Sequence, residues 1–597
     1  MLTKRQFLLS IAALSVSSAL QAAGGPSGPA VHFQAQGKIG EVFVNPYRIA
    51  PLTAIIGNGG YELKDVSVRV VPKKGGQEIA YAVEDRICRT HGGIPVFGLY
   101  ADYQNTVEVS YTRYANGKSE RVEKETYRIY AGPANIRTAG YAGVTSVFPK
   151  AEVKKMDPAF SDRLYLINNM IAATPESTRA VWNNPMGGAL EWNRYPQNAI
   201  YDTKGELRWY MDPSTIFNYH DIYRAGIMMG FRQNKDGAFT WGYGQRYVKY
   251  DLMGREIWNR RLPISYNDFS HSLDPAQNGH FFLRVASSNV KLANGQNVRT
   301  VRDVIAEVDH DGYVVDEFRL FDILDPYRSD VIKALDQGAV CLNIDASKAG
   351  KTLSEEDIRK LNESDHYGDI AGTGIGRNWA HVNSVDYDKA DDSIIISSRH
   401  QSAVIKIGRD KEVKWILGAP NGWNGKLREK VLTPVDKDGK PIPCRIGKCE
   451  GDFDWTWTQH TGWKVDELSE PGVSVVTVFD NGDGRAFKQP ENPKEKYSRA
   501  VMYRIDEKKG TVEQIWEYGK NRGHELYSAI TSSVEYEADK DSLLVYWASI
   551  GVQDKTGVNP VLTEFRRGGK DPVFEMQIRG SMGYRALAID LGKAFKE

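Results

Sequence analysis

The sequence predicts an all-β protein in which a six-bladed β-propeller follows an N-terminal β-sandwich domain. The 597 residues include 31 Tyr, 13 Trp and 56 Gly, a composition that suits aromatic-rich strands joined by tight turns. Two patterns support this fold: short alternating runs in the first part of the chain, and a β-hairpin motif that returns six times afterwards. The chain is long enough to bury a large core in more than one domain.

The chain begins with the features of a secretory signal peptide. Lys4 and Arg5 form a basic start, residues 7–20 are mostly apolar, and Gln21-Ala22-Ala23 offers small residues for cleavage after Ala22. The apolar stretch is short for a membrane span, and no later segment of the sequence has the length and apolarity to cross a bilayer. We therefore expect residues 1–22 to be a signal peptide and the mature protein to be exported.

Residues 23–135 are predicted to form the β-sandwich. Short runs alternate polar and apolar residues between turn signals, as in VSVRV at 66–70 and TVEVSY at 106–111. A period of two places successive side chains on opposite faces of a strand, which is typical of sheets with one buried face. We assign no chemistry to this domain.

Residues 136–597 are predicted to form the propeller. An apolar strand, a charged turn that usually contains Gly, and a second strand that often carries Trp return six times. These hairpins lie at residues 199–209, 248–258, 306–315, 404–415, 503–516 and 564–575. Six hairpins in one array indicate six blades. The apolar segment 583–589 follows the last hairpin, and we expect it to complete the first blade, because closing the ring removes a free sheet edge.

Four of the 11 histidines occupy a matching position, just ahead of the predicted inner strands of neighbouring blades. They are His220, His271, His381 and His460. Inner strands line the channel of a propeller, so we expect these side chains to converge at one mouth of the channel. A structural hydrogen-bonding role is the alternative for a single histidine, and His220 is given no assigned role.

Arg399 joins this group by its position. It ends the predicted strand 393–399, which is expected to pair with the inner strand that carries His381. A short turn joins these strands, so Arg399 should return to the same end of the channel. An ordinary salt bridge is the alternative for Arg399, and the next residue, His400, is interpreted as an ordinary strand or surface residue.

Histidines beside an arginine, without an obvious carboxylate partner, indicate a site for an anion. Arg offers planar donors to oxyanions, and a nearby Arg favours the neutral, nucleophilic form of an imidazole. Such a histidine could accept a sulfuryl or phosphoryl group. Three histidines could instead bind zinc in a metal-dependent hydrolase or lyase, although a cation beside Arg399 is unfavourable. A propeller that only binds other proteins is a third alternative.

Charge and motifs disfavour other classes of function. The formal net charge of +1 gives no electrostatic footprint for nucleic acid. The sequence contains no Gly-x4-Gly-Lys-Ser/Thr loop for nucleotide phosphates. We therefore expect neither a nucleic-acid partner nor a phosphate-loop mechanism.

The four cysteines have different surroundings in the sequence. Cys444 and Cys449 close a short loop that suits a local disulfide, and two free thiols are the alternative. Cys341 lies in an apolar run and is interpreted as a buried thiol. Cys88 is assigned to a polar loop and supports no further interpretation.

Several strings in these regions resemble the bacterial arylsulfate sulfotransferases. They are RNWAHVNS (377–384), SSRHQ (397–401), TQHT (458–461), FDNGDGR (479–485), FGLY (97–100) and YRAL (584–587). The resemblance spans nearly the whole mature chain. It implies a periplasmic homodimer whose subunits have a six-bladed propeller and an N-terminal β-domain, with no cofactor and no metal. Cys444 and Cys449 resemble the disulfide of that family, which a periplasmic thiol oxidase forms.

The resemblance also implies roles for single residues. The nucleophile that becomes sulfated is His460. The residues that contact the sulfuryl group are His271, His381 and Arg399, with Asn383 as a helper. The group passes from a phenolic sulfate ester to an acceptor phenol in a ping-pong reaction without a nucleotide sulfate donor. Four tryptophans are interpreted either as stacking partners of the phenols or as packing between blades: Trp379, Trp455, Trp457 and Trp463.

Overall fold

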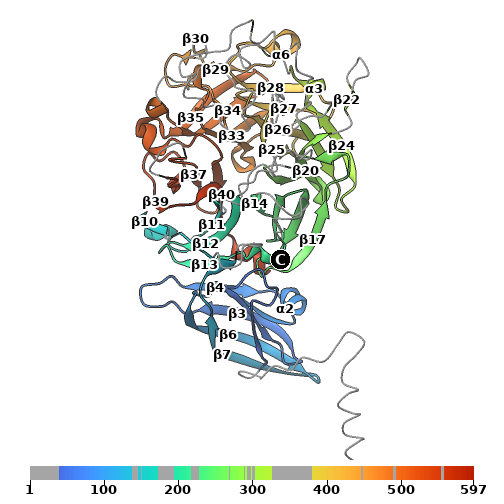
Figure 1. The fold of residues 1–597 in the computed structure, drawn as a ribbon, viewed down its shortest axis with the longest axis vertical. Helices are drawn as coiled ribbons and strands as arrows, with labels where there is room; N and C mark the ends of the chain where they lie inside the picture. Colours follow the sequence, from blue (N-terminus) through green and yellow to red (C-terminus); the bar gives the residue numbers. More distant parts are fainter. Residues whose placement is uncertain are drawn as a thin grey trace, which may run out of the picture.

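The structure, a computed structural model, consists of a small β-sandwich and a larger ring of sheets (Figure 1). It describes residues 39–137, 145–149, 151–172, 194–216, 228–267, 269, 271–287, 290–291, 297–298, 303–325, 328, 356, 380–445, 448–487, 493–552 and 557–596. The predicted signal peptide, His220, Cys341 and Trp379 lie outside these described residues. The domain limits 23–135 and 136–597 stay predictions.

The N-terminal domain is a sandwich of two antiparallel sheets, coloured blue in Figure 1. One sheet has the order β1 (Val42–Val44), β2 (Thr53–Gly57), β5 (Gly93–Phe97). The other has the order β4 (Ile79–Val83), β3 (Glu62–Val70), β6 (Tyr103–Ala115), β7 (Lys118–Ala131). Residues of β4 are alternately buried and exposed, so the period of two in the sequence places one face of the sheet in the core.

A short helix, α2 (Asp85–His91), lies between β4 and β5 and corrects the interpretation of Cys88. Cys88 is on the buried side of this helix, not in a polar loop. The polar residues around it, Arg86, Arg89 and Thr90, occupy the exposed faces of the helix. Burial raises the pKa of the Cys88 thiol to about 12, so this free thiol is unreactive.

The propeller has six mainly antiparallel sheets, which we name blades 1 to 6 in chain order and describe from the axis outwards. Blade 1 is β40 (Met582–Ala588), β11 (Leu164–Ala172), β12 (Arg194–Asp202), β13 (Leu207–Tyr210). Blade 2 is β14 (Met229–Gln233), β15 (Phe239–Tyr243), β16 (Arg246–Tyr250), β17 (Glu256–Arg261). Blade 3 is β19 (Leu273–Pro275), β20 (Phe281–Ser287), β23 (Val304–Val308), β24 (Val314–Arg319), with β18 (Tyr266–Asn267) also paired to β20.

The remaining blades include two extra outer strands. Blade 4 is β25 (Val382–Asp388), β26 (Ser393–Ser398), β27 (Ala403–Ile407), β28 (Val413–Gly418). Blade 5 is β32 (Thr461–Lys464), β33 (Val473–Asp480), β34 (Arg499–Asp506), β35 (Thr511–Tyr518), β29 (Thr433–Val435). Blade 6 is β36 (Ser533–Glu537), β37 (Ser542–Trp547), β38 (Val561–Arg566), β39 (Phe574–Ile578), β10 (Ala151–Met156).

Each predicted hairpin is the pair of strands in the outer part of one blade, and its turn has a physical cause. The Asp202 side chain accepts hydrogen bonds from the backbone amides two and four residues later, and Gly205 has a φ of 76°. Asp309 makes the same two bonds, and Gly312 has a φ of 93°. An Asx-type turn followed by a left-handed glycine therefore explains the repeated Asp-x-x-Gly in the sequence.

The six inner strands contact one another in a closed ring, in the order β40, β14, β19, β25, β32, β36 and back to β40. As the sequence predicts, the last strand, β40, pairs with β11 and completes blade 1. The structure adds a second closure, because β10 from the start of the propeller pairs with β39 at the outer edge of blade 6. Both ends of the propeller chain thus join sheets formed by the opposite end.

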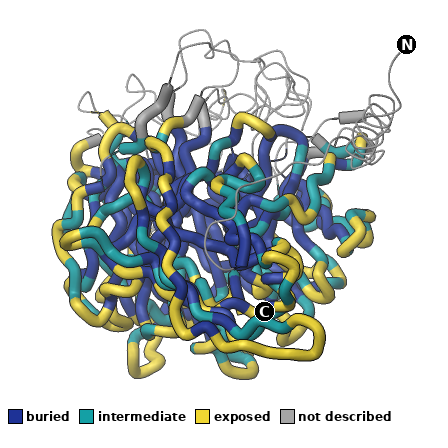
Figure 2. Tube along the Cα trace, turned by 90° about the horizontal axis from the view of Figure 1, so that it is seen from below, coloured by how far each residue is buried: buried dark blue, intermediate teal, exposed yellow. Residues whose placement is uncertain are grey.

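The apolar core lies between the blades. Separate clusters of buried side chains fill the interfaces of blades 2 and 3, 3 and 4, 4 and 5, and 5 and 6. Figure 2 shows this buried interior in dark blue, with exposed turns at the periphery. Trp455 and Trp457 belong to the cluster between blades 4 and 5, so of the two roles considered for them, packing is the one observed.

The sandwich is packed firmly on the propeller. One apolar cluster joins it to blades 1, 2 and 6. Arg208 of β13 donates hydrogen bonds to the backbone carbonyls of Gln77 and Gly98. The terminal helix α7 (Leu591–Lys596) places Phe595 on Tyr81, with ring centroids 4.5 Å apart.

Two further features were predicted from the sequence. Cys444 and Cys449 form a disulfide that joins β30 (Cys444–Arg445) to β31 (Lys448–Cys449), which confirms the predicted local bridge. Within the described ranges, no helix has the length and apolarity needed to cross a membrane.

Candidate active site

Three of the predicted histidines meet at one mouth of the channel. His271, His381 and His460 each come just before the inner strand of blades 3, 4 and 5. The ring centroid of His271 is 5.3 Å from that of His381 and 5.6 Å from that of His460. All three side chains are buried. The matching positions in the sequence therefore correspond to one cluster in space.

The backbone turns sharply where these histidines enter the channel. His271 has a φ of 69° and His381 a φ of 47°, in the left-handed region that residues with a Cβ seldom adopt. Ser532, just before the inner strand of blade 6, has a φ of 84°. Strained positions of this kind persist where the surrounding fold holds them, and they cluster at functional sites.

One nitrogen of the His460 ring is assigned by its hydrogen bond. Nδ1 lies 3.1 Å from the backbone carbonyl oxygen of Ser532. A carbonyl oxygen can only accept, so Nδ1 must carry the proton. In the neutral ring Nε2 then keeps its lone pair. The backbone amide of His460 donates to the carbonyl of Phe479, which fixes the residue against the second strand of its blade.

The surroundings of His460 favour its neutral form. Burial, together with the positive charges of Arg585 and Arg399, holds the pKa of His460 well below its usual value. A neutral imidazole is the nucleophilic form. The same arginine charges attract an anion and repel a metal cation.

Arg399 reaches the site as its position in the sequence predicted. Its backbone amide donates to the carbonyl of His381. Its guanidinium donates to the carbonyls of Thr458 and Ala529 and pairs with Asp483 at 3.2 Å. Among the described residues, its buried Nε has no hydrogen-bond partner. The Nε–H of Arg399 is thus left for a ligand while Nη1 and Nη2 hold the group in place.

Asn383 contacts the segment that carries His460 and not the histidine itself. Its Nδ2 donates to the carbonyl of Gln459 at 3.4 Å. Gln459 in turn donates to the carbonyls of Ser398 and Ala403 at 3.1 and 2.8 Å. These bonds join blade 4 to the residue before His460, so they orient the segment that carries this histidine.

The structure adds three residues that the sequence interpretation left out of the site. His400 is buried, and its ring centroid is 4.6 Å from that of His381, so it is not an ordinary surface residue. Tyr584 lies 5.1 Å from His460 by ring centroids, and Arg585 follows it on β40. Tyr584 and Arg585 lie in the strand that the sequence predicted to close the ring. Treating that strand as an inner strand of the channel would have assigned both residues to the site.

Charged residues fill the channel below the histidines. Asp274 pairs with Arg284 at 2.7 Å and lies 3.7 Å from Arg232. Two guanidinium groups lie over the ring of Trp463. Their central carbons are 4.6 Å (Arg585) and 5.4 Å (Arg232) from the ring centroid. In the part of the chain that the structure describes, no group of three or more His, Cys, Asp and Glu side chains is arranged to hold a metal ion.

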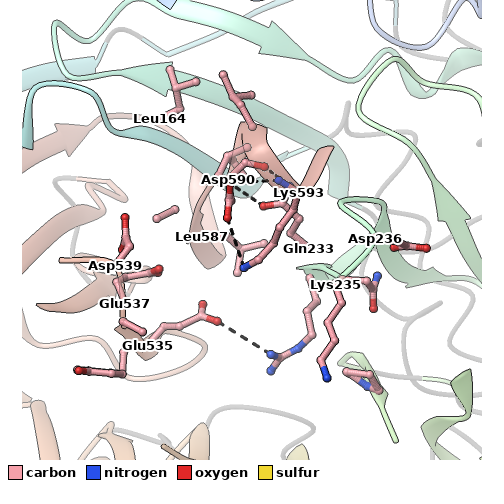
Figure 3. Close-up of a pocket in the computed structure, with 18 of the residues that line it drawn as sticks. Leu164, Gln233, Lys235, Asp236, Glu535, Glu537, Asp539, Leu587, Asp590 and Lys593 are labelled. Carbon is pink, nitrogen blue, oxygen red and sulfur yellow. Dashed lines mark hydrogen bonds and ion pairs between the residues drawn. The ribbon is translucent and has the colours of Figure 1, made fainter. Parts of the chain in front are cut away.

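A pocket of about 1110 Å³ lies at the opposite end of the inner strands (Figure 3). Its lining includes Gln233, Pro275 and Glu537, the last residues of β14, β19 and β36, whereas the histidines come before the first residues of their strands. Burial and the neighbouring Glu535 raise the pKa of Glu537 well above its usual value. The histidine cluster and this pocket are therefore separate sites.

Comparisons with known proteins show the family to which the chain belongs. Residues 150–585 match the family described as Arylsulfotransferase (ASST), and residues 41–132 match the Arylsulfotransferase Ig-like domain. An arylsulfate sulfotransferase of Escherichia coli O6:H1 is 42% identical over 558 residues, which cover 91% of this chain and 89% of that protein. One from Lelliottia amnigena is 42% identical over 536 residues, covering 87% and 86%. The chain therefore belongs to the arylsulfotransferase family of enzymes.

Proposed function

We propose that this enzyme transfers a sulfuryl group from a phenolic sulfate ester to an acceptor phenol, in a ping-pong reaction through sulfated His460 and without a nucleotide donor. The observation that carries the proposal is the hydrogen bond from His460 Nδ1 to Ser532, because it leaves a lone pair on Nε2. The relatives are named arylsulfate sulfotransferases, which supports an aryl sulfate as the donor.

In the first half-reaction, the Nε2 lone pair attacks the sulfur of the donor ester. The bond between sulfur and the phenolic oxygen breaks, and its electron pair leaves with the phenolate. The sulfuryl group is then on Nε2, while Nδ1 keeps its proton and its bond to Ser532. The products are a sulfo-imidazolium and a phenolate, which together carry the charge of the donor anion. Because phenols have a pKa of about 10, protonation by His271 or His381 assists departure.

In the second half-reaction, an acceptor phenol gives its proton to one of the same histidines. The resulting phenolate oxygen attacks the sulfur, the bond from sulfur to Nε2 breaks, and the electron pair returns to His460. Charge on the sulfuryl oxygens in both transition states is stabilised by donors already in place, as in phosphoryl transfer. We assign this role to Arg399, His271 and His381, and a positioning role to Asn383.

An apolar cluster next to the histidines suits the aromatic ring of a phenol. Its buried members include Met170, Met229, Ile530, Met582 and Tyr584. Flexible methionines adapt to rings of different shape, and Tyr584 also contacts His460. The cluster thus offers an apolar surface beside a positively charged site.

The test is the covalent intermediate. After incubation with 4-nitrophenyl sulfate and no acceptor, peptide mass spectrometry should find a sulfuryl group on His460, and an added phenol should remove it. His460→Ala should abolish labelling and turnover, whereas His310→Asn, at an exposed histidine, should change neither. Labelling of another residue, or turnover that depends on a chelatable metal, would contradict the proposal and favour a metal-dependent hydrolase.

We propose further that the chain is exported to the periplasm, that a thiol oxidase forms the Cys444–Cys449 bond there, and that the mature protein is a homodimer. N-terminal sequencing of protein from the periplasmic fraction should begin at Ala23. Light scattering should give twice the mass of the mature chain. A cytoplasmic protein that retains residues 1–22 would contradict export.

A further inference from the structure

We propose that Arg585 is a second guanidinium of the sulfuryl site, which donates hydrogen bonds to the oxygens of the transferred group together with Arg399. This inference rests on the function proposed above and names an additional substrate-binding residue for it. Arg585 lies on β40, the strand that closes the ring, so both the closure of the fold and the binding of the substrate would depend on one strand.

Arg585 has unused hydrogen-bonding capacity inside the protein. Its side chain is 1% exposed. Among the described residues, its Nε and Nη1 have no hydrogen-bond partner, and Nη2 only reaches Ser272 Oγ at 3.4 Å. A buried polar group without a partner costs roughly 1–3 kcal/mol, and more when it is charged. A ligand that supplies oxyanions would remove this cost.

Two other buried arginines, Arg208 and Arg499, use all of their nitrogens within the protein. Arg208 uses all three of its nitrogens, on Asp202 and on the carbonyls of Gln77 and Gly98. Arg499 likewise uses all three nitrogens on carboxylates, an amide oxygen and backbone carbonyls. Arg585 differs from both, because two of its three nitrogens have no hydrogen-bond partner in the part of the chain that the structure describes.

A β-bulge directs this part of β40 across the channel. Asn168 of β11 is opposite Arg585 and Asn169 is opposite Gly583, so Tyr584 is an extra residue in β40. Bulges re-aim side chains and are common next to active sites. Here Tyr584 contacts His460, and Arg585 reaches across to Ser272.

The guanidinium is held against the inner strand that follows the nucleophile. It lies 4.6 Å from the ring of Trp463, which is on the same inner strand, β32, that follows His460. An arginine stacked on an aromatic face keeps its N–H groups free in the plane of the guanidinium. Of the charges that lower the pKa of His460, that of Arg585 acts most strongly.

Charge balance favours an anion next to Arg585. Two carboxylates act on Arg585, those of Asp274 and Glu535. Asp274 already pairs with Arg284 at 2.7 Å and lies 3.7 Å from Arg232, and Glu535 lies 4.0 Å from Arg232. The charge of Asp274 is shared among these two arginines and Arg585. A sulfuryl group at His460 would supply the missing negative charge.

The decisive measurement is the first turnover of 4-nitrophenyl sulfate, followed by nitrophenol release and by the mass of the His460 peptide. Arg585→Gln should sulfate His460 more slowly by roughly 10²–10³-fold, the effect of losing one donor to a transition-state oxyanion. Arg585→Lys should recover part of the rate, because it keeps the charge but loses the fork of donors. The matched control, Arg579→Gln, changes an exposed arginine just before β40 and should react like the wild type.

A pH profile separates binding from a merely structural role. The groups that face His460 are Arg585 and Tyr584 from blade 1, His271 and Arg284 from blade 3, Arg399 from blade 4 and the Ser532 carbonyl from blade 6. Removing the Arg585 charge raises the pKa of His460, so the acid limb of the rate should move to higher pH in Arg585→Gln. It should stay in place in Arg585→Lys.

The outcomes distinguish this inference from the proposed function. If wild-type protein is never sulfated on His460, the proposed function is wrong. If wild type is sulfated and Arg585→Gln reacts within about threefold of it with the same pH profile, only the role of Arg585 is wrong. Should Arg585→Gln not fold, Arg585→Lys decides, and a rate within about threefold of wild type overturns the role.

Discussion

At the scale of single residues, the site depends on how buried charges are compensated. Asp483 illustrates this, because its side chain has no exposed surface. Its carboxylate pairs with Arg399 at 3.2 Å and with Lys496 at 2.9 Å, and it accepts a hydrogen bond from Tyr527 at 3.0 Å. The position of Arg399 beside the histidines therefore depends on a residue outside the cluster.

Replacing Asp483 with Asn should destabilise the protein strongly. Two buried cations would lose their counter-charge, which costs about 3–5 kcal/mol. Urea unfolding measures this loss, and sulfation of His460 should slow in parallel as Arg399 loses its anchor. Asp541→Asn is the control, because its pair with Arg567 is exposed and such pairs contribute about 0–1 kcal/mol. If Asp483→Asn and Asp541→Asn lose the same free energy of unfolding, Asp483 is not needed to balance the buried charges of Arg399 and Lys496.

At the scale of elements, the contact of helix α2 with blade 2 contains a buried histidine. His91 Nδ1 lies 2.7 Å from the hydroxyl of Tyr47, and Nε2 lies 3.7 Å from Asp251. Burial and the charge of Arg255 lower the pKa of His91 to about 4. The contact between sandwich and propeller therefore contains a neutral imidazole.

This contact should weaken in acid. The unfolded chain has the ordinary histidine pKa of about 6.5, so His91 contributes stability that is complete above that pH and is lost as the pH falls towards about 4. Near neutral pH the wild type should have a higher melting temperature than His91→Asn. This excess in melting temperature should shrink as the pH falls over this range. The exposed His310 provides a control variant, His310→Asn, whose difference from wild type should stay constant. If the melting temperatures of wild type and His91→Asn change in parallel with pH, the predicted link between protonation of His91 and stability is wrong.

At the scale of the whole molecule, the ring is closed twice by segments from opposite ends of the chain. The inner strand β40 joins blade 1, and the outer strand β10 joins blade 6. Such closure removes unpaired strand edges, which are otherwise sites of aggregation. The closing strand β40 also carries Tyr584 and Arg585. The strand that closes the ring therefore also brings these two side chains to the histidine cluster.

A chain that ends at Gly580 should therefore lose both the closed ring and the activity. It lacks β40, so the edge of β11 is exposed, and we expect aggregation and no cooperative calorimetric transition. A chain that ends at Asp590 keeps β40 and loses only α7, including the stacking of Phe595 on Tyr81. That control should unfold cooperatively at a lower temperature and still sulfate His460. Cooperative unfolding of the shorter chain at the wild-type temperature would show that closure is dispensable.

Prediction from the sequence succeeded where a local pattern carried the information. The charged turns, most of them containing Gly, marked the outer hairpins, and the positions of His271, His381 and His460 relative to the inner strands identified the cluster. It failed for β10, which is short and pairs only with a strand more than 400 residues away. His400 was misjudged because the residue beside Arg399 also turns inward, which a strict period of two does not predict.

The sequence by itself determined the all-β class, the six blades, the closing strand and the identity of three clustered histidines, because periodicity and turn chemistry are local properties of the chain. Only the tertiary structure decided which nitrogen of His460 carries the proton, since that depends on a carbonyl 72 residues away. It also decided that two nitrogens of Arg585 have no hydrogen-bond partner among the residues that the structure describes. Whether a buried charge is compensated depends on every blade around the channel, and no segment of the sequence encodes it alone.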